Sequence, residues 1–312
     1  MMEKNSSIYV AYHEDALGAA ILRNFQQRGF KNLILRTKKE LDLKNARAVK
    51  KFFEKNKPEH VFLSAGKSGS LAMNIKQPAD LIAENLKIEL NVIEAAKENK
   101  TKKLLFFGAS CIYPLRAPQP IKEDAYLTGE IESTSQAYAV AKIVGVEFCR
   151  AIAAEDGLNF FTAIPATIYG PGSVFDLENS HVLTALIKKF CDAKANSEKE
   201  VVILGSGKPL REFIYVDDLA EASVFLMENS EIPGEIYNIG SGEEISIRNL
   251  AEKIKKIVGF EGIVRFDDSR PDGAKRKFLN SIKIKKLGWK PKISLYDGIR
   301  KTIEFYQKFF RT

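Results

Sequence analysis

The first half of the chain alternates short apolar runs with longer stretches in which apolar residues recur every three or four positions. Short apolar runs predict buried strands, and the recurring spacing predicts amphipathic helices. The predicted strands are Ile8–Ala11, Asn32–Leu35, His60–Ala65, Lys103–Gly108 and Phe160–Pro165, and the predicted helices are Ala16–Arg28, Ala46–Lys55, Pro78–Lys97 and about Gln136–Ala154. Because helices separate the strands, we expect an α/β fold with a Rossmann-type, doubly wound parallel sheet and functional residues directly after strands.

The pattern loosens beyond Gly170-Pro171-Gly172, where shorter elements follow. We expect an amphipathic stretch at 181–193, a strand at 201–204, a helix at 217–227 and a strand at 235–239. The predicted division is a dinucleotide-binding domain of residues 1–165 plus about 198–230, and a smaller α/β substrate-binding domain of about 166–197 plus 231–312. The ligand pocket is expected between the two.

The composition is that of a soluble globular protein. The 312 residues are 45% hydrophobic and 28% charged, and no apolar run approaches the roughly 18 residues that a membrane helix needs. We therefore expect a cytoplasmic, enzyme-sized protein without membrane association. The three cysteines, Cys111, Cys149 and Cys191, form no Cys-x-x-Cys pair, and there are only three histidines. These counts favour neither a disulfide framework nor a metal site.

The net charge of +8 is concentrated at the C-terminus. Residues 251–312 hold 17 Lys and Arg against 7 Asp and Glu. This region has no recognisable nucleic-acid motif, so we expect no nucleic-acid partner. A local basic excess is also what a phosphate-bearing small molecule would require.

A tyrosine and a lysine in the predicted helix after Pro120 are candidates for proton transfer. Tyr138 and Lys142 are four residues apart, which places both side chains on one helix face. A nearby ammonium lowers the pKa of a phenol, and such a pair can protonate a carbonyl that is being reduced. With ten tyrosines in a Lys-rich chain, about one such spacing is expected by chance.

Several longer segments carry a family resemblance. They are Gly108-Ala109-Ser110-Cys111-Ile112-Tyr113-Pro114, Tyr138-Ala139-Val140-Ala141-Lys142, Asn179-Ser180-His181-Val182, Gly205-Ser206-Gly207-Lys208-Pro209-Leu210-Arg211-Glu212-Phe213 and Arg270-Pro271-Asp272-Gly273. Through them the chain resembles, over nearly its whole length, the extended short-chain dehydrogenase/reductases, and within these the GDP-L-fucose synthase family. The resemblance implies a homodimer that epimerises GDP-4-keto-6-deoxymannose at C3 and C5 and then reduces C4 with NADPH.

The resemblance also implies roles for residues. Tyr138 would donate a proton at C4, Lys142 would lower the tyrosine pKa and orient the cofactor, and Cys111 and His181 would be the acid and base of epimerisation. A thiol and an imidazole suit proton transfer near neutral pH. The plainer alternatives are that Cys111 is a buried apolar side chain at a strand end and that His181 caps the following helix.

Further positions are assigned to ligands in the same way. The expected substrate-binding residues are Thr167, Asn179, Lys189, Arg211 and Asp272, and the expected cofactor-binding residues are Gly18, Arg36, Lys38, Ala65 and Lys142.

The glycine-rich turn of the family is altered here. The chain reads Tyr12-His13-Glu14-Asp15-Ala16-Leu17-Gly18, which keeps only the glycine that lets the helix pack on the strand. Asp15 puts a carboxylate where a pyrophosphate would lie, and Glu14 replaces an arginine that would face the 2′-phosphate. Tyr12, Glu14 and Asp15 therefore put NADPH binding in question.

The catalytic serine of the family is also replaced, by Ala109. Loss of one such hydrogen-bond donor typically costs a factor of 10²–10³ in rate. Ser110 is adjacent, but it substitutes only if the backbone turns there, because successive strand side chains point to opposite faces.

Two other functions remain open. One is a GDP-4-keto-sugar epimerase that has lost NADPH-dependent reduction, and the other is a non-catalytic nucleotide-sugar-binding protein. The choice between hexose and heptose substrates is open as well.

Overall fold

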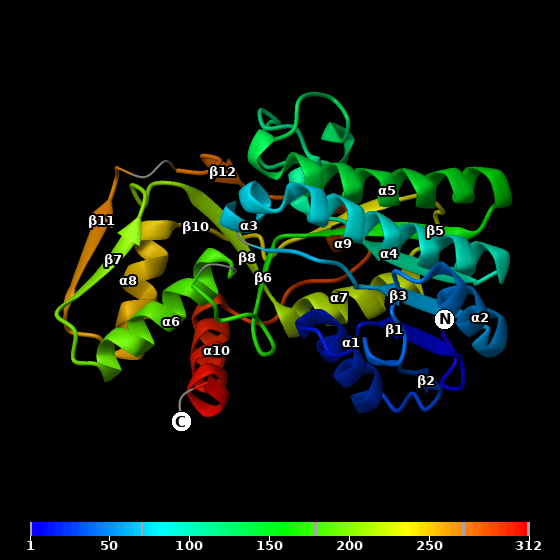
Figure 1. Ribbon diagram of the computed structural model, residues 1–312, viewed down its shortest axis with the longest axis horizontal. Coiled ribbons are helices and arrows are strands. Elements are labelled where there is room, and N and C mark those ends of the chain that lie inside the picture. The colour runs from blue at the N-terminus through cyan, green and yellow to red at the C-terminus, as the bar shows by residue number, and fades with distance from the viewer. Residues whose placement is uncertain (1, 70, 178–179, 270–271, 311–312) are drawn as a thin grey trace.

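The computed structural model describes residues 2–69, 71–177, 180–269 and 272–310 and contains the expected parallel sheet (Figure 1). Its first-half elements are β1 (Ile8–Ala11), α1 (Ala16–Gln27), β2 (Leu33–Ile34), α2 (Ala46–Asn56), β3 (His60–Leu63), α3 (Leu71–Lys76), α4 (Pro78–Glu98), β4 (Lys103–Phe107), the 3₁₀ turns η1 (Ser110–Ile112), η2 (Glu123–Ala125) and η3 (Ser133–Ser135), α5 (Gln136–Asp156) and β5 (Asn159–Pro165). The later elements are β6 (Thr167–Tyr169), α6 (Val182–Ala195), β7 (Glu200–Leu204), β8 (Leu210–Tyr215), α7 (Val216–Asn229), β9 (Ile236–Ile239), β10 (Glu244–Ser246), α8 (Ile247–Val258), β11 (Ile263–Asp267), β12 (Arg276–Lys277), α9 (Ile282–Lys286) and α10 (Leu295–Phe310).

The central sheet has six parallel strands in the order β2-β1-β3-β4-β5-β9. All residues of β1, β3 and β9 are buried, which is why these strands are mainly apolar and do not alternate between apolar and polar residues. Crossovers run in opposite directions from β1, so a ligand crevice is expected at the carboxyl end of this strand. The Rossmann-type fold class is confirmed.

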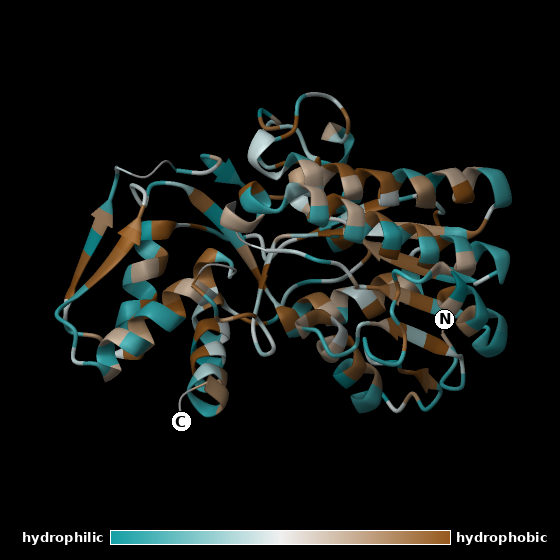
Figure 2. Ribbon diagram, viewed as in Figure 1, coloured by the Kyte–Doolittle hydropathy of each residue, from teal (hydrophilic) through white to brown (hydrophobic). Residues whose placement is uncertain are grey.

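Helices cover both faces of this sheet. Helices α2, α4 and α5 pack side by side on one face, and α1 packs against α7 on the other (Figure 1). Figure 2 shows brown, apolar strands in the middle and teal, polar positions on the outer sides of the helices. The main apolar core therefore lies between the sheet and its two helical layers.

A second, smaller apolar core lies in the other part of the molecule. Strands β10, β8 and β12 form one sheet, in which β6 also pairs with β8, and β7 pairs with β11. Helices α6, α8 and α10 contribute the apolar side chains that pack with these strands. Together they form the smaller α/β part that the sequence indicated.

Three strands differ from the division expected from the sequence. β7 and β8 lie in the smaller part, where Val201, Ile203 and Phe213 join the second core, although 198–230 was expected in the larger domain. β9 is the edge strand of the central sheet and pairs with β5, although 231–312 was expected in the smaller domain. All three are short, mainly apolar strands, and only their partners decide the sheet to which each belongs.

Candidate active site

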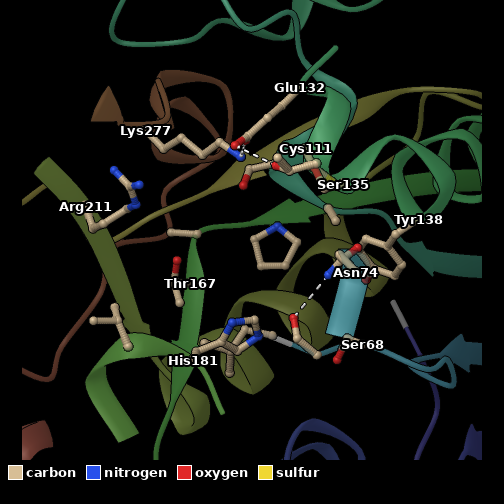
Figure 3. Close-up of a pocket in the computed structure, with 18 of the residues that line it drawn as sticks. Ser68, Asn74, Cys111, Glu132, Ser135, Tyr138, Thr167, His181, Arg211 and Lys277 are labelled. Atoms are coloured by element: carbon tan, nitrogen blue, oxygen red, sulfur yellow. Dashed lines mark hydrogen bonds and ion pairs between the residues drawn. The ribbon is translucent and has the colours of Figure 1, made fainter. Parts of the chain in front are cut away.

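A cavity of about 390 Å³ lies at the carboxyl end of the central sheet, between the two parts of the molecule (Figure 3). This volume is within the range of small-molecule sites. The lining residues come from both parts: Ser68, Gly69, Asn74, Gly108, Ala109, Ser110, Cys111, Glu132, Thr134, Ser135, Tyr138, Pro165, Ala166, Thr167, Ile168, Ser180, His181, Val182, Arg211 and Lys277. Six of the expected site residues therefore meet in one place, namely Ser110, Cys111, Tyr138, Thr167, His181 and Arg211.

The segment after β4 delivers Cys111 to this cavity. Ala109 is still extended, with φ −149° and ψ 150°, and the chain then turns into η1 at Ser110. Because of this turn, Ala109, Ser110 and Cys111 all line the cavity. The thiol is 8% exposed, so Cys111 is both a buried side chain, as the plainer alternative held, and a cavity wall.

Tyr138 and Lys142 share a face of α5, as their spacing predicts. The Lys142 ammonium lies 5.8 Å from the centre of the Tyr138 ring. It also forms a buried ion pair with Glu89 of α4 at 2.9 Å and donates a hydrogen bond to the carbonyl of Phe107 at 3.1 Å. Tyr138 faces the cavity, whereas Lys142 lies behind it and is not among its lining residues.

The low pKa expected for Tyr138 is wrong. Burial raises the pKa of Tyr138 to about 12, although the Lys142 charge lowers it. Burial by itself would lower the pKa of Lys142, but attraction to the Glu89 carboxylate raises it above its usual value. The lysine charge is thus shared with Glu89, and the phenol is protonated at neutral pH.

Cys111 and His181 both line the cavity, and burial shifts their pKa values in opposite directions. Burial raises the pKa of the Cys111 thiol to about 11, against the favourable charges of Lys277 and Lys142. Desolvation lowers the pKa of His181 below its usual 6.5. His181 is the N-cap residue of α6, but its side chain makes no capping hydrogen bond, so the imidazole is available to a ligand.

The side of the cavity formed by the smaller part is basic. Strands β8 and β12 are parallel neighbours, and their register places Lys277 beside Arg211. Lys277 forms an ion pair with Glu132 at 3.2 Å, and Arg211 donates to the carbonyl of Leu210 at 2.8 Å. Burial lowers the pKa of Arg211, which indicates a partly desolvated guanidinium with further donors for an anion.

Two expected substrate residues, Lys189 and Asp272, lie outside the cavity lining. Lys189 is not a cavity residue, because its ammonium donates to the carbonyl of Val202 at 2.9 Å. Asp272 accepts hydrogen bonds from the amide and hydroxyl of Ser206, at 2.9 and 2.6 Å, and so stabilises the turn after β7. Asn179 lies outside the described residues.

The turn between β1 and α1 is the expected dinucleotide end. A Cβ atom at Gly18 would lie 2.4 Å from the carbonyl oxygen of Tyr12, so only glycine allows α1 to pack this closely. Tyr12 itself has φ 54°, a left-handed conformation in which glycine is normally favoured. Its ring is 7% exposed, and burial together with the charges of Asp42 and Glu84 raises its pKa to about 12.

The charges around this turn are already paired with one another. Lys38 forms an ion pair with Asp15 at 2.8 Å and lies 4.6 Å from the centre of the Tyr12 ring. The Lys38 amide donates to Glu14 at 3.0 Å. Arg36 donates to the carbonyl of Leu35 at 2.6 Å and lies over the Phe52 ring.

Ala65 continues this line of residues towards the cavity. It is buried after β3, and a Cβ atom at the next residue, Gly66, would lie 3.4 Å from the Lys142 ammonium. The expected cofactor residues thus follow the carboxyl edge of the sheet from Gly18 to Lys142. Their donors and close backbone fit a dinucleotide if the Lys38–Asp15 pair opens. An exposed pair of this kind contributes only about 0.2–1 kcal/mol.

Sequence reasoning missed several residues of the cavity. Lys277 and Glu132 form its ion pair, and Thr134, Ser135, Asn74 and Ser68 line it as well. The excess of Lys and Arg near the C-terminus indicated a phosphate-bearing ligand but not which lysine would lie in the cavity. Ser135 is the N-cap residue of α5, three residues before Tyr138.

The cysteines outside the cavity are Cys149 and Cys191. Both are buried in the apolar cores. Across residues 2–69, 71–177, 180–269 and 272–310, no three His, Cys, Asp or Glu side chains gather as a metal site would require. Over the same residues no helix has the length and apolar character to span a membrane.

The chain is similar to known proteins over most of its length. Residues 11–240 match the model of the NAD dependent epimerase/dehydratase family. GDP-L-fucose synthase 1 of Arabidopsis thaliana is 48% identical over 99% of this chain and 95% of the plant protein. GDP-L-fucose synthase of Escherichia coli K12 is 41% identical over 96% of each. The solved structure of MlghC, a GDP-mannoheptose C4 reductase from Campylobacter jejuni with NADP bound, has a TM-score of 0.89 and 40% identity over 98% of this chain and all of that one.

Proposed function

The chain belongs to the NAD dependent epimerase/dehydratase family, and from this premise we propose that it is a nucleotide-sugar epimerase/reductase of the GDP-L-fucose synthase type. The substrate is a GDP-4-keto-6-deoxy sugar, which is epimerised at C3 and C5 and then reduced at C4. The observation that carries the proposal is that Cys111, Tyr138 and His181, from three different elements, line one cavity.

Epimerisation requires proton removal and delivery at carbons beside a ketone. The Tyr138 phenol, protonated because its pKa is about 12, donates a hydrogen bond to the C4 oxygen and stabilises the enolate. Cys111 and His181 exchange protons with C3 and C5. The raised pKa of Cys111 and the lowered pKa of His181 give the cavity a thiol that can donate a proton and a neutral imidazole that can accept one.

Reduction uses the same oxygen. A nicotinamide cofactor supplies a hydride to C4 when bound, and we propose NADPH because Arg36 and Lys38 are basic groups near the expected 2′-phosphate. Tyr138 delivers the proton to the resulting alkoxide. Lys142, held by Glu89 and the Phe107 carbonyl, provides the positive charge that favours this proton transfer.

The diphosphate is held at the basic side of the cavity. Arg211 and Lys277 lie side by side on β8 and β12, and a planar guanidinium next to an ammonium suits a diphosphate. Thr167, whose hydroxyl can donate one hydrogen bond, lines the cavity between this side and His181 (Figure 3). A homodimer and a cytoplasmic location remain predictions.

An epimerase without reductase activity is the second candidate. The Lys38–Asp15 pair and the left-handed Tyr12 favour it, since both occupy the turn that a dinucleotide would approach. The cavity that carries proton transfer is unaffected by either.

One experiment tests both candidates. The purified protein is incubated with GDP-4-keto-6-deoxymannose in deuterium oxide, with and without NADPH. We expect deuterium at C3 and C5 with and without NADPH. Where NADPH is present, we also expect it to be consumed as the keto sugar is reduced. Deuterium uptake without any NADPH consumption supports the second candidate, and the absence of both reactions contradicts the two of them.

A further inference from the structure

The keto oxygen needs more than one hydrogen-bond donor. Negative charge develops on this oxygen in the enolate and again in the alkoxide, and donors fixed around it lower both barriers. Tyr138 is one such donor. The residue between β4 and η1 in the cavity wall is Ala109, and a methyl group cannot donate a hydrogen bond.

Ser135 has a hydroxyl with no partner in the protein. It occupies the N-cap position of α5, where serine normally accepts a hydrogen bond from the first turn, but its side chain makes no such bond. Its oxygen is sheltered from solvent and has no hydrogen-bond partner among the described residues. Buried hydroxyls are nearly always hydrogen-bonded, so a bound ligand is the expected partner of this hydroxyl.

The hydroxyl is placed to act together with Tyr138. Ser135 lines the same cavity as Cys111 and Tyr138 (Figure 3). It is the N-cap residue of α5, three residues before Tyr138, so the start of one helix brings both hydroxyls to the cavity wall.

Neighbouring hydroxyls are less suitable. Thr134 donates to Glu132 at 3.1 Å, and Ser180 donates to the carbonyl of Asp176. Ser110, the substitute considered from the sequence, also borders a second, much smaller cavity beside Tyr113 and Pro114. Ser135 is the cavity hydroxyl whose spare donor lies closest in sequence to Tyr138.

We propose that Ser135 donates a hydrogen bond to the C4 oxygen of the sugar and takes the place of the hydroxyl that Ala109 lacks. This assignment rests on the proposed function. Ser135 loses no proton. At the C4 oxygen Tyr138 alone transfers a proton, and Ser135 stabilises the oxyanion before and during that transfer.

The test compares three variants. Ser135→Ala removes the hydroxyl, and Ser133→Ala is the matched control because Ser133 is an exposed serine of the same 3₁₀ turn. Ser135→Ala combined with Ala109→Ser restores a hydroxyl from the β4 side. The readouts are kcat and KM with the keto sugar and NADPH, the rate of deuterium exchange at C3 and C5, and the thermal unfolding midpoint.

We expect Ser135→Ala to lower kcat and the exchange rate by about 10²–10³ with little change in KM or unfolding. Ser133→Ala should behave as the wild type. The double variant should have kcat and exchange rates at least tenfold higher than those of Ser135→Ala. Wild-type rates in Ser135→Ala overturn the assignment. A rate loss that Ala109→Ser does not repair, accompanied by a lower unfolding midpoint, also overturns it, because it shows a structural role.

Different results would contradict the Ser135 assignment and the proposed function. If the wild type consumes NADPH or exchanges deuterium and Ser135→Ala does so equally well, only the serine assignment is wrong. If the wild type does neither, the proposed function is wrong and the assignment falls with it.

Discussion

The two ends of the crevice differ in how their polar groups are satisfied. In the cavity, the Ser135 hydroxyl has no partner among the described residues, and the side chain of His181 does not cap its helix. At the turn after β1, Lys38 is paired with Asp15, and Glu14 accepts from the Lys38 amide. The cavity thus offers unused donors and acceptors, whereas the turn has already paired its own.

This difference shows which part of the site is ready for a ligand. A group that is already oriented and unpaired binds without first breaking another interaction. At the turn, a dinucleotide must separate Lys38 from Asp15 and then lie near the Asp15 carboxylate. We therefore expect a preformed substrate end and a cofactor end that rearranges on binding.

The largest effect is expected at the cavity end. Tyr138→Phe removes the proton donor while keeping the ring, so kcat for reduction should fall by about 10²–10⁴ with KM nearly unchanged. Steady-state kinetics with the keto sugar and NADPH measure this. Tyr296→Phe, at a half-exposed tyrosine of α10, is the control. A Tyr138→Phe enzyme that keeps most of its kcat would exclude Tyr138 as the acid.

An intermediate effect is expected at the basic side of the cavity. Arg211→Lys keeps the charge but loses the planar fork, and hydrogen bonds to charged groups are worth about 1.5–3 kcal/mol. GDP affinity, measured by calorimetric titration, should fall about tenfold to a hundredfold. Arg300→Lys, at an exposed arginine paired with Glu304, should leave it unchanged. Equal affinities for the wild type and Arg211→Lys would remove Arg211 from the diphosphate site.

The smallest effect, of opposite sign, is expected at the turn. Asp15→Asn removes the carboxylate and frees Lys38, so NADPH should bind about tenfold more tightly. The repulsion between the Asp15 carboxylate and the pyrophosphate would reach about 3 kcal/mol if it were unscreened, and solvent screens much of it. A fluorescence titration measures this. The cap of α1 is not weakened, because the Asp15 side chain makes no capping hydrogen bond.

The matched control for this prediction is Asp156→Asn. Asp156 is an exposed aspartate paired with Lys97 on the surface, and its loss should leave NADPH affinity as it is. If Asp15→Asn binds NADPH no more tightly than the wild type, the two ends of the crevice do not differ in the way described above.

Much of the fold was predictable because its signals are local. The strands β1, β3, β4 and β5 are mainly apolar runs, and their spacing by helices predicts parallel pairing. The errors concern β7, β8 and β9, which resemble other short strands and differ only in the strands with which they pair. The lowered pKa expected for Tyr138 was wrong because burial of the phenol in the folded chain raises its pKa more than the Lys142 charge lowers it.

The sequence by itself determined the parallel sheet, the shared helix face of Tyr138 and Lys142 and the presence of Cys111 after β4. These features depend on residues close together in the chain. Only the tertiary structure decided that Lys277 stands beside Arg211, that Lys38 neutralises Asp15 and that the Ser135 hydroxyl faces the cavity instead of capping α5. Each of these depends on contacts between segments that are far apart in sequence or on a side-chain direction, and the apolar pattern encodes neither.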